Sequence, residues 1–229
     1  AVAVLVRARR TGILHRALAS PTSLGVQLAG MAAGWFTLCL LQSVLIVVGG
    51  AVAFGVYWGK PLAASLLVIT FALVGCGAGL LVGAHGANED RVGAITPIVG
   101  MVLGALGGCM VPAEIFPSSM LVVARMVPHS WAMRAWQSLI FDGAGLGAIA
   151  GDLAVLAALV ANALIAVAKF VGYAVTGSSS MLAEAVHSVA DSGNQGLLLL
   201  GGRRAKKAAN EEHPFGYGRE RYFWAFVVA

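Results

Sequence analysis

The chain has 229 residues, of which 59% are hydrophobic and 11% are charged, and its mean hydropathy is +0.86. Soluble domains carry about 25% charged residues, so this composition excludes an ordinary soluble protein and indicates a membrane protein. The formal net charge of +5 comes largely from the segments RARRTGILHR and GGRRAKKA, which flank apolar stretches. Such clusters are typical of the cytoplasmic ends of membrane spans, and we expect no nucleic-acid partner.

Five apolar stretches come near or exceed the ~20 residues that a helix needs to cross hydrocarbon. They are 28–56, 61–84, 93–111, 153–176 and 181–200, and another begins at Tyr222. Lipid satisfies no backbone hydrogen bonds, and strands of a β-barrel would give shorter, alternating segments. The predicted fold class is therefore all-α and polytopic, with the plasma membrane as expected location. Because the chain starts at Ala1 and stops inside an apolar segment, we expect both ends to be cut.

Residues 112–150 differ from the spans because they combine three prolines with Arg125 and Arg134. This composition predicts re-entrant or interfacial pieces instead of a spanning helix. Glu114 and His129 are candidate ligands in this segment, although a position at the membrane–water boundary is the favoured interpretation.

The amino-acid sequence of this segment is distinctive. Residues 1–150 resemble the carboxyl-terminal half of the permease subunit of type-2 ABC exporters, and the resemblance is carried by GGCMVPAEIFPSSM, PHSWAMRAWQSLIFDGAG and the upstream RRTGILHRALASPTS. The resemblance implies export of a drug, lipid or polysaccharide-like substrate with a separate ATPase subunit, contacted near Arg7–Arg16. The chain has no GxxxxGK[ST] phosphate loop, so we expect a transporter and not an enzyme.

A polar stripe interrupts the last apolar stretch, in SSSMLAEAVHSVADSGNQ (178–195). At 100° per residue its polar members fall within an arc of roughly 120°: Glu184, His187, Ser188, Asp191, Asn194 and Gln195. An ionisable group at the bilayer centre costs at least ~2.5–3.5 kcal/mol, so these groups need partners, water or a cation.

His187 and Asp191 are four positions apart in the sequence, one helical turn, which places an imidazole nitrogen next to a carboxylate oxygen. Two such ligands are half of a tetrahedral zinc site, with manganese, cobalt, iron and nickel left open. Because metal displaces protons from these ligands, the pair suits a metal/proton exchanger. The alternative is that the two side chains only hydrogen-bond each other and a neighbouring helix.

The surrounding sequence resembles the first two spans, the following loop and the start of the third span of cation diffusion facilitators. The resemblance runs from ANALIAVAKFVGYAVTGSSSM to HPFGYGRERYFWAF. The resemblance implies that His187 and Asp191 supply half of a transport site for zinc or a related divalent ion. The family's fifth span, which supplies the other half, is absent from this chain. A homodimer is a further expectation.

The loop NEEHPFGYGRER corresponds to an accessory metal site in some facilitators, with His213 matching and Glu211 beside it. Asn210 and Tyr217 stand where those members have Asp and His. We therefore interpret Glu211 and His213 as solvated loop residues.

The two resemblances divide the chain into modules 1–150 and 151–229, which meet between residues 143 and 157. A cytoplasmic 203–207 requires 153–176 to run outward, whereas a cytoplasmic 7–16 followed by three spans requires the same stretch to run inward. An inverted module, a hidden crossing in 112–150 or a join of two incomplete transporters would each explain this, and we favour a join.

The leading functional hypothesis is a membrane transport protein whose carboxyl-terminal part comes from a divalent-cation/proton antiporter. An ABC-exporter permease is the alternative, and a fusion or truncated fragment that does not transport is the third.

Overall fold

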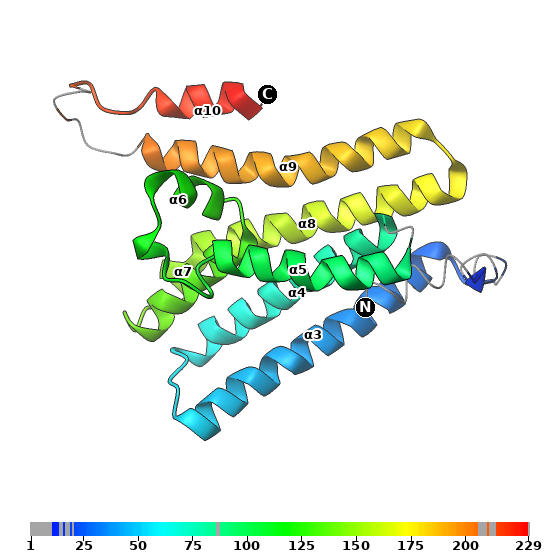
Figure 1. Cartoon of the computed structure of the whole chain (residues 1–229), viewed down its shortest axis with the longest axis horizontal. Coiled ribbons are helices and arrows are strands. Elements are labelled where there is room, and N and C mark those ends of the chain that lie inside the picture. Colours follow the sequence, from blue (N-terminus) through cyan, green and yellow to red (C-terminus); the bar gives the residue numbers. More distant parts are fainter. Residues whose placement is uncertain are drawn as a thin grey trace.

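The computed structural model describes residues 11–13, 16, 19, 21–85, 88–205, 210 and 214–228, and its elements are helical as predicted (Figure 1). The helices are α3 Leu24–Phe54, α4 Pro61–His85, α5 Glu89–Leu106, the short 3-10 helix η1 Ala113–Ile115, α6 Ser118–Ala124, α7 Pro128–Ile140, α8 Leu146–Thr176, α9 Ser179–Arg204 and α10 Glu220–Val228.

Three helices of the described chain are long and apolar enough to cross a membrane, over Gly25–Phe54, Pro61–Ala84 and Leu146–Tyr173. They overlap the predicted spans 28–56, 61–84 and 153–176, and the third begins seven residues earlier than predicted. The predicted spans 93–111 and 181–200 fall on α5 and α9, which are not among the three. The first turn of α5 carries Glu89 and Asp90, and α9 carries the polar stripe.

Local signals set the ends of these helices. Ser23 caps α3, because its Oγ accepts a hydrogen bond from the Val26 amide at 3.4 Å. Asn88 caps α5 in the same way, through the Asp90 amide at 2.9 Å. Gly55 ends α3 and Gly177 ends α8, with φ of 65° and 67°, in the left-handed region that glycine adopts most easily. Each of these two glycines lets the next helix turn back.

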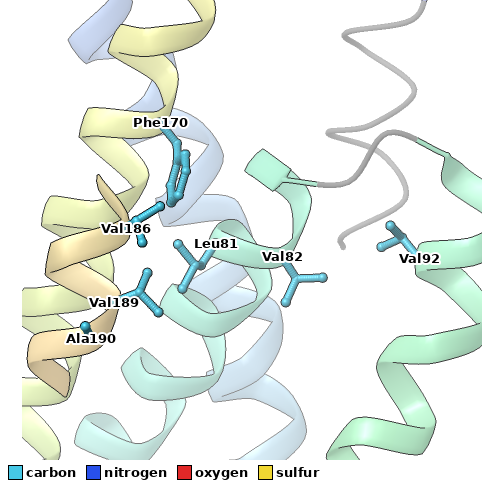
Figure 2. Close-up of a pocket in the computed structure, with 7 residues that line it drawn as sticks. All are labelled: Leu81, Val82, Val92, Phe170, Val186, Val189 and Ala190. Carbon is cyan, nitrogen blue, oxygen red and sulfur yellow. The ribbon is translucent and has the colours of Figure 1, made fainter. Parts of the chain in front are cut away.

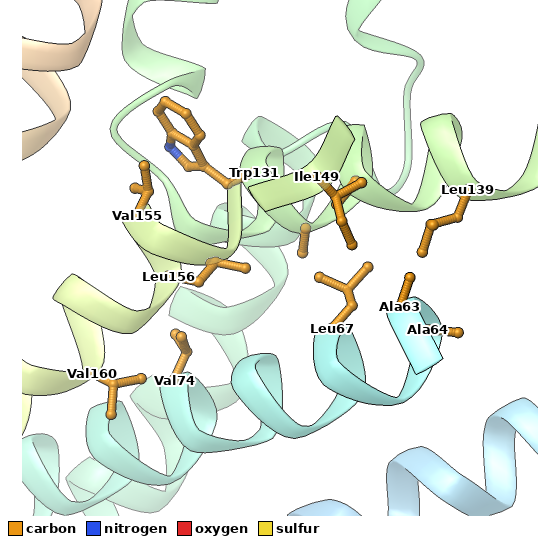
Figure 3. Packing of buried hydrophobic residues seen from close by; sticks show 12 residues of the cluster. Ala63, Ala64, Leu67, Val74, Trp131, Leu139, Ile149, Val155, Leu156 and Val160 are labelled. Atoms are coloured by element: carbon orange, nitrogen blue, oxygen red, sulfur yellow. The ribbon is translucent and has the colours of Figure 1, made fainter. Parts of the chain in front are cut away.

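The core places α4 and α8 side by side in the same direction (Figure 3). At one end the amino-terminal residues of α4 share a buried cluster with Ile149, and further along Val74 meets Leu156 and Val160. Helix α3 contacts the far end of α4, and α9 turns back along α8, so both run opposite to this pair. Consequently the start of α3 and the end of α9 lie at opposite ends of the bundle.

The segment between α5 and α8 is built from short pieces, as the sequence predicts. Helix α6 has 7 residues and α7 has 13, and both are too short for the ~20 residues of a crossing, which argues against a hidden span. Helix α7 instead packs against α4 and α8 through four buried side chains, Trp131, Ala132, Ala135 and Leu139.

Polar contacts fix the position of α7. The indole of Trp131 donates to the carbonyl of Arg125 at 2.7 Å, and the guanidinium of Arg134 stacks 4.3 Å from the Trp131 ring while pairing with Asp152 on α8. This ion pair connects α7, which precedes the segment 143–157, to Asp152 within that segment. Helix α8 begins at Leu146 and runs unbroken through the rest of that segment.

Candidate metal-transport site

Contacts with α8 set the rotation of α9. Ala185 is fully buried against Ala166 and Phe170, and Met181 packs so closely on Gly172 that a Cβ there would lie 2.4 Å from the Met181 Cε. A larger residue at position 172 would require the Met181 side chain to move. The face of α9 beside Ala185 is therefore committed to α8.

The polar pair on α9 lies away from this contact. The Nε2 atom of His187 and the Oδ1 atom of Asp191 are 3.6 Å apart, and the side chains are 75% and 43% exposed on the described chain. The predicted adjacency is confirmed as geometry. Because 3.6 Å is longer than a hydrogen bond, the two side chains do not hydrogen-bond each other. A lone pair on the Nε2 atom and one on the Oδ1 atom can therefore both face a third atom.

The rest of the stripe divides between other partners. Glu184 pairs with Lys169 on α8, with Nζ and Oε2 3.1 Å apart. Ser188, which the sequence places in the stripe, is 6% exposed and donates from Oγ to the Glu184 carbonyl at 3.0 Å. It stands at the edge of the stripe next to Ala185, so packing turns it inward. The side chains of Asn194 and Gln195 lie outside the described residues.

His187 and Asp191 are a partial site. Among the described residues no group of three or more His, Cys, Asp or Glu side chains comes together. His213 and Glu211 fall outside the described part of the chain. Of the neighbouring loop residues, Asn210 donates from Nδ2 to the Tyr217 hydroxyl at 2.9 Å, an amide–phenol contact that offers weak ligands for a divalent cation.

Sequence reasoning missed an apolar cavity beside a different face of α9 from the one that carries His187 and Asp191. Val186, Val189 and Ala190 line a cavity of about 630 Å³ between α9, α8, α4 and α5 (Figure 2). The remaining walls come from Leu81, Val82, Val92 and Phe170. The two valines are three positions apart, about 100° and 160° around the helix from His187, and this spacing is the signal in the sequence for the apolar face.

Comparisons with known proteins agree with both parts of the chain. Residues 1–169 match the family described as ABC-2 family transporter protein, and residues 155–229 match the cation efflux transmembrane domain. The linearmycin resistance permease protein LnrN of Bacillus subtilis is 27% identical over 161 residues, which are 70% of this chain and 42% of LnrN.

Relatives of the carboxyl-terminal part are named for zinc antiport or for metal tolerance. The mitochondrial proton-coupled zinc antiporter SLC30A9 of Homo sapiens is 38% identical over 73 residues, 32% of this chain and 13% of that protein. Metal tolerance protein C4 of Arabidopsis thaliana is 41% identical over 76 residues, 33% of this chain and 17% of that protein.

The chain thus spans less than half the length of each of these relatives. No solved structure matches the chain. The two family matches overlap on residues 155–169, all of them within α8. The chain belongs to the ABC-2 family of transporter proteins through residues 1–169, and its residues 155–229 match the cation efflux transmembrane domain, with the two matches sharing part of helix α8.

Proposed function

We propose that the carboxyl-terminal part of this membrane transporter binds a divalent cation, zinc above all, at His187 and Asp191, as one half of a proton-coupled transport site. The observation that carries the proposal is the open pair itself: two ligand atoms 3.6 Å apart, on a helix within the cation efflux match. The relatives named as zinc antiporters support zinc as the cargo.

The chemistry follows from the two side chains. A neutral imidazole nitrogen and a carboxylate oxygen are both ligands that zinc accepts, and each must lose its proton before it binds metal. Metal entry therefore releases protons, and protonation releases metal. The two missing ligands must come from outside this pair, and we propose that a second copy of the chain, in a homodimer, supplies them in the plasma membrane.

Zinc binding to the full chain in lipid nanodiscs tests the proposal. We expect His187→Ala and Asp191→Asn each to weaken zinc binding on the order of tenfold or more, because either change leaves one ligand of the pair. Proton release in weak buffer should fall with binding. Asp142→Asn is the matched control, since Asp142 is an exposed carboxylate in the turn before α8. Unchanged affinity in both site variants would refute the site.

A second function is favoured by the match over residues 1–169 and by the relative named as a permease. We propose that this part works as a permease with a separate ATPase, with a module boundary between 143 and 157. An ATP-hydrolysing subunit should co-purify with the chain from native membranes. Its absence would count against this function and leave the metal site untouched.

A further inference from the structure

Helices α3 and α4 touch at one end and separate at the other. Near the start of α3, Ala32, Trp35 and Phe36 pack on Cys76 and Leu80, and the Cys76 thiol donates to the Ala32 carbonyl at 3.4 Å. Toward the loop at residues 55–60, an apolar groove of about 640 Å³ opens between the two helices. Its walls include Val44, Val48 and Ala51 of α3 and Ala64, Val68 and Ile69 of α4.

This α3–α4 groove lies at hydrocarbon depth and is open at its side. Both helices are candidate spans, so these wall residues belong to the part of the chain that faces lipid or protein. Val44, Val48 and Ile69 are 44%, 52% and 38% exposed. An apolar, laterally open groove of this kind offers nothing to a polar solute, whereas an acyl chain gains contact along its length.

Two aromatic residues mark the mouth of the α3–α4 groove. Tyr57 and Trp58 line it from the loop, and the Trp58 indole packs edge-on against Trp136, with ring centroids 5.2 Å apart. A Cβ on Gly50 would lie 2.7 Å from the Trp58 ring, so the indole is held against α3 as well. Tyr and Trp concentrate at membrane–water boundaries, which places the mouth at headgroup level.

A cation adjoins the lining of this groove. Lys60 stands between Gly59 and Pro61, which line the groove, and it is exposed. Its side chain extends toward the start of α8, where a Cβ on Gly145 would lie 3.3 Å from the Lys60 Nζ. Among the described residues no carboxylate oxygen lies within 4 Å of this Nζ. A lysine at headgroup level attracts anionic lipid. The apolar walls therefore suit the acyl chain of a lipid, and the charge of Lys60 suits the anionic headgroup of the same lipid.

We propose that the α3–α4 groove binds one acyl chain of an anionic phospholipid, with the lipid phosphate at the Lys60 ammonium group. The fixed indole of Trp58 forms one wall of the groove and makes the occupant directly observable. Neither the metal pair nor the ATPase enters this proposal, so its test is independent of both.

Quenching of Trp58 fluorescence by lipids with brominated acyl chains tests the proposal on the full chain in vesicles. The Trp58 signal is the difference between the wild type and Trp58→Phe. We expect brominated phosphatidylglycerol to quench it at about fivefold lower mole fraction than brominated phosphatidylcholine, the preference expected from one lysine at headgroup level. Lys60→Gln should make the two lipids equal, whereas Arg91→Gln, the loss of an exposed charge at the start of α5, should keep the preference.

Ala51→Phe places a ring inside the α3–α4 groove and should remove most of the quenching by either lipid. Equal quenching by the two lipids in the wild type would overturn the proposal, as would a preference that survives Lys60→Gln. If Trp58 is shielded from both lipids and becomes accessible only when the protein is diluted in the bilayer, a second copy occupies the groove and the proposal is wrong.

Discussion

At the scale of single residues, His129 is held in an environment that disfavours its charged form. Its ring meets Phe71 of α4 edge-on, with centroids 5.3 Å apart, and its Nδ1 atom is buried without a hydrogen-bond partner in the described part of the chain. Burial lowers the pKa of His129 below its ordinary value of 6.5. The sequence offers His129 as a ligand or a boundary residue, and the contacts make it a packing residue.

This burial predicts a pH dependence of stability. Between the lowered pKa of the folded state and 6.5, the unfolded chain binds more protons than the folded chain, so stability falls as the pH drops through this window. The slope from one group is at most about 1.4 kcal/mol per pH unit. The variant His129→Phe keeps a ring against Phe71. We expect its apparent melting temperature in detergent to depend less on pH between pH 7 and pH 5 than that of the wild type. An equal slope in both proteins would rule out His129 as the source.

At the scale of elements, the ion pair between Arg134 of α7 and Asp152 of α8 joins the interfacial segment to the shared helix. The side chains are 33% and 13% exposed, and Arg134 also stacks on Trp131. Asp152→Asn leaves the guanidinium without its carboxylate, and we expect a loss of about 1.5–3 kcal/mol in the free energy of unfolding. Chemical denaturation in detergent measures this loss.

A double variant separates the contribution of the ion pair from the cost of leaving Arg134 without its carboxylate. Arg134→Met together with Asp152→Leu removes both charges, so it should recover most of the stability that Asp152→Asn loses. Asp142→Asn changes an exposed carboxylate ten residues away and should have no effect. If Asp152→Asn is as stable as the wild type, then the helices are held by apolar packing alone.

The same scale shows what the sequence can and cannot predict. Hydropathy placed the spans at 28–56, 61–84 and 153–176, and helical spacing predicted that His187 and Asp191 are neighbours, because both depend on nearby residues only. The end of α5 depends on a residue that is distant in sequence, His129. Helix α5 ends at Leu106, although the apolar stretch continues to 111. Directly after it the chain passes so close to α7 that a Cβ on Gly107 would lie 2.3 Å from the Cβ of His129.

Packing also decides which side of a helix is polar. Ser188 lies within the predicted stripe, yet it turns inward because Ala185 beside it is fully buried against α8. The single sequence of α9 contains no information on where α8 will lie. For the same reason it could not reveal the cavity beside the apolar face of α9, which needs Leu81 and Val92 from other helices.

For the whole molecule, the helix directions make the conflict between the two modules concrete. Helices α4 and α8 run the same way, and α3 and α9 run the other way. The start of α3, which follows the basic segment 7–16 in the sequence, and the end of α9 at Arg204 therefore lie at opposite ends of the bundle. If α9 crosses the membrane, only one of these clusters is cytoplasmic, although both carry the charge typical of that side. The direction of α8 agrees with the requirement derived from the amino-terminal part.

Labelling of single cysteines from one side of the membrane tests this arrangement. In a Cys109→Ser background, where the remaining Cys39 and Cys76 lie inside α3 and α4, an impermeant maleimide is applied to sealed vesicles carrying one added cysteine. The positions, each of them outside a helix, are Thr22→Cys, Asp142→Cys, Ser178→Cys and Asn210→Cys.

We expect positions 22 and 178 to be labelled from one side and 142 and 210 from the other, because α3 and α9 run opposite to α4 and α8. Labelling of 22 and 142 from the same side would mean that the chain crosses the membrane an even number of times between them, so that α8 follows the facilitator direction while the amino-terminal part keeps its own orientation. Labelling of 178 and 210 from the same side would mean that α9 does not cross. His187 and Asp191 would then lie along the membrane surface, where a cation can bind but cannot be carried through.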